Sequence, residues 1–334
     1  MLRVWLCLVA FGAASQAAAA NWNPKLAAAY LDERQGKWFD WPVARKTGGP
    51  CLSCHTGVPY LVARPLLRRA LGENAPTKWE TGLLDALRAR VDSRDAKALF
   101  GQTREPHASE SIGVESIFAA VFLRGSAAAM QRLWDLQLRD GQARGAWNWF
   151  ELELDPWENT DAPFFGAALA ALAVKDSPYA APDRVAALAA YLKSAAPQQP
   201  LQNRLALLWT AKSLSGVAKR EWIEEAFASQ EKDGGWTNAS LGPWKTRENA
   251  PPSSGSSAYA TAFAAFTLIQ AGVPVKDAGL ARALDWLRSH QNPAQGYWDA
   301  VSMNKTYPEG SMQSQFMREA ATGYAAAALA LAER

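Results

Sequence analysis

The sequence lacks the charge excess, the long apolar runs and the alternating Val, Ile and Thr patterns that mark several common protein classes. Its net charge is only +3, so there is no strong electrostatic attraction to nucleic acid. The longest apolar run after the N-terminal segment, Phe164 to Val174, has eleven residues, and about eighteen are needed to cross a bilayer. We therefore expect no nucleic-acid partner, no membrane span and no protein built mainly of sheets.

Aromatic and helix-forming residues are abundant instead. The chain contains 15 Trp, 8 Tyr and 12 Phe, and alanine-rich runs recur along it. Of its 334 residues, 49% are hydrophobic and 20% charged, which is too apolar for a disordered chain. Because alanine is the strongest helix former, this balance predicts an all-α protein.

The first twenty residues have the layout of a secretion signal. Arg3 supplies the positive region, Trp5 to Ala14 the apolar core, and Ala18 to Ala20 the small residues of a cleavage site. The apolar core is too short for a membrane anchor. We expect cleavage near Ala20, a single mature domain over residues 21–334, and a periplasmic or secreted location.

Cysteine is scarce, and its placement is informative. Only three cysteines occur, and the first lies in the signal. The others lie in Cys51-Leu52-Ser53-Cys54-His55, where both sulfurs can reach the vinyl groups of one haem and the imidazole can ligate its iron. A redox-active disulfide needs a βαβ context, and a zinc site needs a second ligand pair. The motif resembles the attachment site of c-type cytochromes. It predicts one covalent haem c per chain, bound by Cys51, Cys54 and His55.

Short repeats dominate the rest of the chain. The stretches 230–236 and 291–298 share a Gln, a Gly after three or four intervening residues, and a Trp two positions after that Gly. A looser copy runs from Gln137 to Trp147, and a degenerate copy occupies 35–38. The glycine allows a tight turn at a helix end, the tryptophan can hold that turn against a neighbouring helix, and the glutamine amide can bond exposed backbone.

Two kinds of helix alternate along the chain. Polar-faced helices are expected near residues 24–34, 78–91, 127–138, 182–194, 219–229 and 277–289. Apolar helices are expected near 58–71, 111–124, 161–174, 202–214, 257–271 and 317–332. Thr77 to Glu80 is a capping box, and Pro65 predicts a kink or a late start in the first apolar helix. Because a helix that is apolar all round must be buried, the six pairs predict an (α/α)6 toroid of six outer and six inner helices rather than an open solenoid.

The stretches 230–236 and 291–298 resemble the QW motifs of the squalene–hopene cyclase and prenyltransferase superfamily. The resemblance implies an (α/α)6 toroid and is clearest over 219–332. The catalytic Asp-x-Asp-Asp segment of the cyclases is missing, and the nearest acidic stretch, 151–161, has different spacing. The resemblance therefore predicts the fold and not the reaction.

In such a ring every connection from an outer to an inner helix lies on one rim, so the long loops gather there. The haem loop, about 35–57, is expected in the first helix pair at the mouth of the central cavity. For the distal iron ligand His107 is the first candidate, and the alternatives are Met303, Met312 and Met317. A surface histidine and packed methionines are the structural alternatives. The stretch 151–161 offers a general acid and base, or only helix-start and loop charges.

Three functions are compatible with these features. The first is an exported monohaem protein that passes electrons to or from a periplasmic redox partner. The second is a haem-dependent oxidoreductase acting on an apolar, isoprenoid-like ligand in the toroid cavity. The third is a terpenoid-cyclase-like binding module without redox function. The cysteine motif favours the first, and no residue is assigned a catalytic role.

Overall fold

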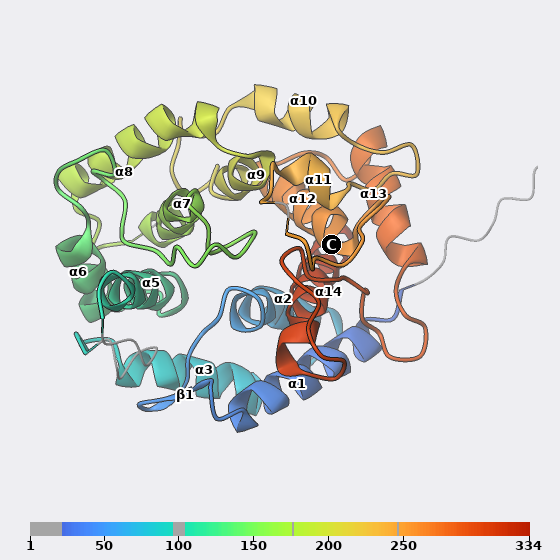
Figure 1. Ribbon diagram of the computed structural model, residues 1–334, viewed down its shortest axis with the longest axis horizontal. Helices are drawn as coiled ribbons and strands as arrows, with labels where there is room; N and C mark the ends of the chain where they lie inside the picture. The colour runs from blue at the N-terminus through green and yellow to red at the C-terminus, as the bar shows by residue number, and fades with distance from the viewer. Residues whose placement is uncertain (1–21, 96–103, 176, 246) are drawn as a thin grey trace, which may run out of the picture.

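The computed structural model describes residues 22–95, 104–175, 177–245 and 247–334, which form a closed ring of helices (Figure 1). The outer helices are α1 (Pro24–Asp40), α3 (Lys78–Ala89), α6 (Ala127–Leu136), α8 (Pro182–Ala195), α10 (Arg220–Ala228) and α13 (Ala278–Ser289). The inner helices are α2 (Gly57–Ala70), α5 (His107–Phe122), α7 (Ala162–Val174), α9 (Leu201–Trp209), α12 (Ala258–Ala271) and α14 (Met312–Ala332). The all-α toroid of six outer and six inner helices is therefore confirmed within the described residues.

The two layers differ in how they bury their side chains. The inner helix α12 is buried continuously over 258–268, and α14 over 319–330. The outer helix α13 buries one stripe, made of Leu280, Ala283, Leu284, Trp286 and Leu287. The stripe has the spacing of a single helix face, which leaves the opposite face of this outer helix to charged residues.

The repeat turns connect consecutive outer helices. The Gln230 amide donates to the carbonyl oxygens of Gly234 in its own turn and of Gly279 in α13, both at 2.8 Å. The Trp236 indole donates to the carbonyl of Ala226 at 2.7 Å. The other two turns repeat this pattern. The amides of Gln137 and Gln291 and the indoles of Trp147 and Trp298 each donate to backbone carbonyl oxygens in the same way. The expected role of the repeat is confirmed.

The last turn also closes the ring. The Gln291 amide donates to the carbonyl of Asn23 at 3.0 Å, directly before α1. In the inner layer α14 lies against α2 so closely that a Cβ on Gly323 would lie 2.5 Å from the Cβ of Pro59. Glycine at this position allows the two helix backbones to approach.

Replacing Gly323 by alanine is expected to destabilise the protein by about 1 to 3 kcal/mol, because the added methyl group clashes with Pro59. Alanine in place of glycine within a helix otherwise stabilises it. Urea unfolding measures the difference, and an unchanged or higher midpoint would show that α2 and α14 are not in this close contact.

Two local expectations were wrong, and some short elements were not foreseen. Helix α2 begins at Gly57 and continues through Pro65, so it does not start late. The degenerate repeat 35–38 lies inside α1 and forms no turn, and the Gln35 amide finds no partner. The hairpin of β1 (Arg45–Lys46) and β2 (Gly49–Pro50) was not foreseen. Nor were the short helices η1 (Ala196–Gln198) and α11 (Asn238–Leu241).

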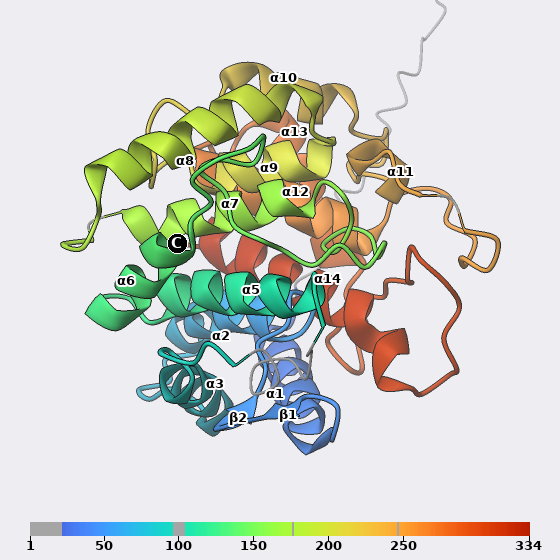
Figure 2. The same ribbon diagram turned by 60° about the vertical axis from the view of Figure 1, so that its left-hand side comes forward.

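The long connections project from one end of the ring. Figure 2 shows the segments around α11 and before α14 at that end, while the C-terminus lies at the opposite end. Over the part of the chain that the structure describes, no helix combines the length and apolarity that crossing a bilayer requires.

Candidate functional site

A pocket of about 180 Å³ lies among the long connections at the rim. It is bounded by four segments: the turn before α2, the acidic stretch before α7, the connection from α13 to α14, and the start of α14. Its lining residues are His55, Leu154, Asp155, Trp157, Glu158, Ser302, Asn304, Tyr307, Gln313, Phe316 and Met317. Residues far apart in the sequence thus share one small enclosure.

Asp155 holds two of these segments together. Its backbone amide donates to Asn304 Oδ1 at 2.8 Å, and its carbonyl accepts from Asn304 Nδ2 at 2.7 Å. One carboxylate oxygen accepts from Asn159 at 2.7 Å and the other from the Lys245 backbone amide at 3.2 Å. With these contacts made, Asp155 builds the wall of the pocket.

Glu158 differs from Asp155 in having no such partners. It is partly buried, it lines the pocket, and no hydrogen bond or ion pair to a described residue reaches its carboxyl group. Burial, with a smaller contribution from the Glu110 carboxylate, raises its pKa from 4.5 to about 7. The group therefore keeps its proton up to nearly neutral pH.

His107 lies outside this pocket, at the first residue of α5. Its Nδ1 is 2.6 Å from Glu110 Oε2, one turn further along the helix. Burial is the main cause of the raised pKa values of Glu158 and Glu151, and the Glu110 carboxylate makes a smaller contribution to both. His107 therefore contacts Glu110 and does not line the pocket.

His55 is held between aromatic rings and a hydroxyl group. Its ring stacks on Phe316 with centroids 3.5 Å apart, and the edge of Trp38 lies 5.4 Å away. Its Nδ1 is 2.7 Å from Thr56 Oγ1. Burial lowers the pKa of His55 to about 3, so the ring is neutral over the physiological range.

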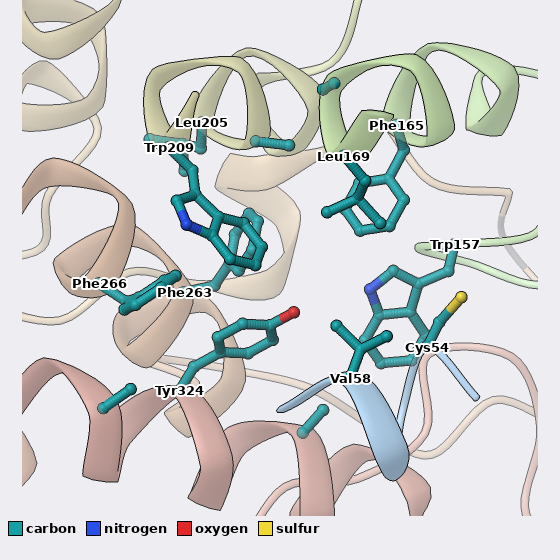
Figure 3. Close-up of a cluster of buried hydrophobic side chains, with 14 of the residues drawn as sticks. Cys54, Val58, Trp157, Phe165, Leu169, Leu205, Trp209, Phe263, Phe266 and Tyr324 are labelled. Carbon is teal, nitrogen blue, oxygen red and sulfur yellow. The ribbon is translucent and has the colours of Figure 1, made fainter. Parts of the chain in front are cut away.

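The two cysteine side chains lie in separate apolar clusters. Cys51 packs with Trp38 and Ala44, whereas Cys54 belongs to the main core. Figure 3 shows Cys54 beside Trp157 and Val58. Burial raises the pKa of Cys51 to about 12 and that of Cys54 well above its usual value. Because the thiolate is the reactive form, this environment does not favour a redox-active disulfide.

The methionine candidates are dispersed. Met317 is buried and lines the pocket with His55. Met312 begins α14, and its sulfur accepts from the Arg34 guanidinium at 3.3 Å. Met303 packs partly buried against the main core. Of the four distal-ligand candidates, only Met317 shares the pocket with His55.

Comparison with known proteins gives a likeness in structure alone. No family model and no curated protein matches the sequence. Eight chains of solved structures match. One is the crystal structure of a possible member of the GH105 family from Salmonella enterica serovar Paratyphi A, 13% identical over 93% of this chain and 94% of that chain, with a TM-score of 0.29. At this level of similarity it supports no statement about activity.

The functions expected from the sequence need correction. The pocket beside His55 is smaller than the roughly 300 to 1,000 Å³ of typical cofactor sites, and Phe316 covers the imidazole face. Among the described residues, no group of three or more His, Cys, Asp or Glu side chains is placed to hold a metal ion.

Haem-mediated electron transfer, a haem-dependent oxidoreductase and a terpenoid-cyclase-like binding module are therefore all set aside. Covalent attachment at Cys51 and Cys54 with ligation by His55 is a chemical step that this geometry does not test, and it stays a prediction of the sequence. Periplasmic or secreted location also stays a prediction. The signal segment that carries it lies outside the described residues.

Proposed function

We propose that the rim pocket is an acid–base site in which Glu158 donates a proton to a small ligand, or to the end of a larger one. The observation that carries this proposal is a pocket-lining carboxyl group without a hydrogen-bond partner among the described residues. A carboxyl group that stays protonated near pH 7 is suited to act as a general acid. The pocket has room for about six water molecules, so only a small group enters it.

Acid-assisted hydrolysis is the reaction class that such a proton donor supports best. When an ester or glycoside bond breaks, its alkoxide leaving group requires a proton. Trp157, Tyr307 and Phe316 supply apolar surface beside Glu158, and Ser302 and Asn304 supply polar groups. The pocket therefore offers one proton donor within a mixed apolar and polar wall.

A comparison of leaving groups tests this proposal. Hydrolysis of methyl glycosides and ethyl esters is measured alongside the matching nitrophenyl compounds, with wild-type protein and Glu158→Gln. We expect the variant to lose about 10² to 10⁴-fold in rate on the alkyl substrates and much less on nitrophenyl ones, which leave without a proton. Glu153→Gln is the matched control, since Glu153 is exposed and paired with Lys245. No turnover of any substrate, or equal losses for both classes, would contradict the proposal.

The raised pKa of Glu158 also predicts a stability effect. Between pH 4.5 and about 7 the unfolded chain loses this proton while the folded protein keeps it, so stability falls as pH rises through that window. Glu158→Gln removes the penalty. Because the group is partly exposed, we expect the variant to be more stable than wild type by only on the order of 2 kcal/mol at pH 8, and equally stable at pH 4. Urea unfolding at both pH values measures this, and a pH-independent difference would speak against a buried proton.

A further inference from the structure

A chain of hydrogen bonds runs from the outer layer to the rim pocket. Arg34 of α1 donates through Nε to Glu319 Oε1 of α14 at 2.6 Å. The other oxygen of Glu319 accepts from the hydroxyl group of Thr56, which directly precedes α2. Thr56 Oγ1 in turn lies 2.7 Å from His55 Nδ1. Three helices separated in sequence thus meet at one imidazole.

The direction of these bonds follows from the charge of Glu319. Its side chain and that of Arg34 are 2% and 8% exposed, and they form an ion pair. Burial raises the pKa of Glu319, and the Arg34 guanidinium and the Thr56 hydroxyl oppose that rise. The contact with the always-charged Arg34 guanidinium is the geometry of an ionised carboxylate. An ionised carboxylate only accepts hydrogen bonds.

Only one arrangement of protons satisfies the chain. Thr56 has a single hydroxyl proton, and Glu319 takes it. The threonine oxygen is then an acceptor toward His55, so the proton of the neutral imidazole must be on Nδ1. Nε2 consequently carries a lone pair. No hydrogen bond joins His55 Nε2 to any described residue, and His55 lines the same pocket as Glu158.

We propose that Arg34, Glu319 and Thr56 are positioning residues that hold His55 as the Nδ1–H tautomer, so that Nε2 accepts a hydrogen bond from a hydroxyl group of the ligand. The pocket then presents a donor, Glu158, and an acceptor, His55 Nε2. In the protein without haem, this pairing fits a neutral ligand that carries a hydroxyl group, or a water molecule held beside it. Iron ligation by His55 would occupy the same Nε2 lone pair. The tautomer follows from the hydrogen bonds alone, whereas the ligand contact rests on the function proposed above.

Nitrogen NMR of untagged, ¹⁵N-labelled protein tests the tautomer. The chain has three histidines, so the spectrum is simple, and His290 serves as an internal control because its Nδ1 bonds the Trp286 carbonyl at 2.7 Å. We expect wild-type His55 to be protonated on Nδ1. Thr56→Val removes the acceptor and is expected to lower the ratio of the Nδ1–H to the Nε2–H form by about tenfold. Thr56→Ser keeps the hydroxyl group and is expected to retain the wild-type ratio.

Each outcome is decisive and separate from the test of Glu158. A wild-type His55 protonated on Nε2 would overturn the inference, and so would a Thr56→Ser spectrum identical to that of Thr56→Val. If Glu158→Gln leaves hydrolysis unchanged while His55 shows the expected tautomer, the proposed function fails and the positioning role of Thr56 stands. If Glu158→Gln slows hydrolysis as expected but His55 does not show the expected tautomer, the proposed function stands and only the positioning role fails.

Discussion

Replacing Glu115 by alanine is expected to lower the free energy of unfolding by about 3 to 5 kcal/mol. Glu115 of α5 and Arg90, which follows α3, form an ion pair at 2.8 Å in which both side chains are fully buried. The Arg90 guanidinium also donates to the carbonyl oxygens of Thr47 at 3.0 Å and Pro50 at 3.3 Å. Without the carboxylate, a positive charge remains buried with only neutral partners.

Urea unfolding of the variant measures the cost, and the exposed pair of Arg88 and Asp85 provides the control. These two side chains are 59% and 61% exposed, so Asp85→Ala is expected to cost less than about 1 kcal/mol. The double replacement Arg90→Met with Glu115→Leu is expected to recover much of the loss, because it removes both buried charges. A cost for Glu115→Ala no larger than that for Asp85→Ala would refute the argument.

Replacing Trp236 by alanine in the wild-type protein is expected to lower the free energy of unfolding by about 3 to 5 kcal/mol. Trp236 is completely buried at the turn between α10 and α11. Its indole nitrogen donates to the Ala226 carbonyl at 2.7 Å, and its backbone amide donates to Thr261 Oγ1 of α12 at 3.0 Å. Truncation leaves a cavity where an outer and an inner helix meet, and it removes one of these bonds.

The variant Trp236→Phe separates the two contributions. It keeps most of the aromatic volume and loses the indole bond to Ala226, so we expect it to cost about 1 to 3 kcal/mol. Thermal or urea unfolding of both variants measures the difference. Equal costs for alanine and phenylalanine would mean that packing of the ring does not hold this turn.

The helices of the ring were predictable because their signals are local. Apolar periodicity, the capping box at Thr77 and the proline that begins α8 depend only on near neighbours in the chain. The repeat glutamines were predictable for the same reason, since a Gln, a Gly and a Trp recur in the same order at each of their turns. At Pro65 and Gln35 local rules failed, since α2 begins before Pro65 and continues through it, and Gln35 lies within α1 rather than at a turn.

The site was only partly predictable. The stretch 151–161 was recognised as acidic, but Glu158 was not singled out, since its sequence neighbours do not show which carboxylates are satisfied. Asp155 has a structural role instead, because Asn304, 149 residues away in the sequence, binds its backbone. Phe316 and Glu319 of α14 determine the surroundings of His55 and Thr56, and no sequence pattern links them.

The ring of paired helices follows from patterns that repeat within a few turns of helix, and such patterns can be recognised in the chain before it folds. The proton on Glu158, the tautomer of His55 and the size of the pocket between them depend on burial and on partners from distant helices. Burial and these distant partners exist only after the ring has closed, because desolvation and hydrogen-bond geometry are set by which segments come into contact.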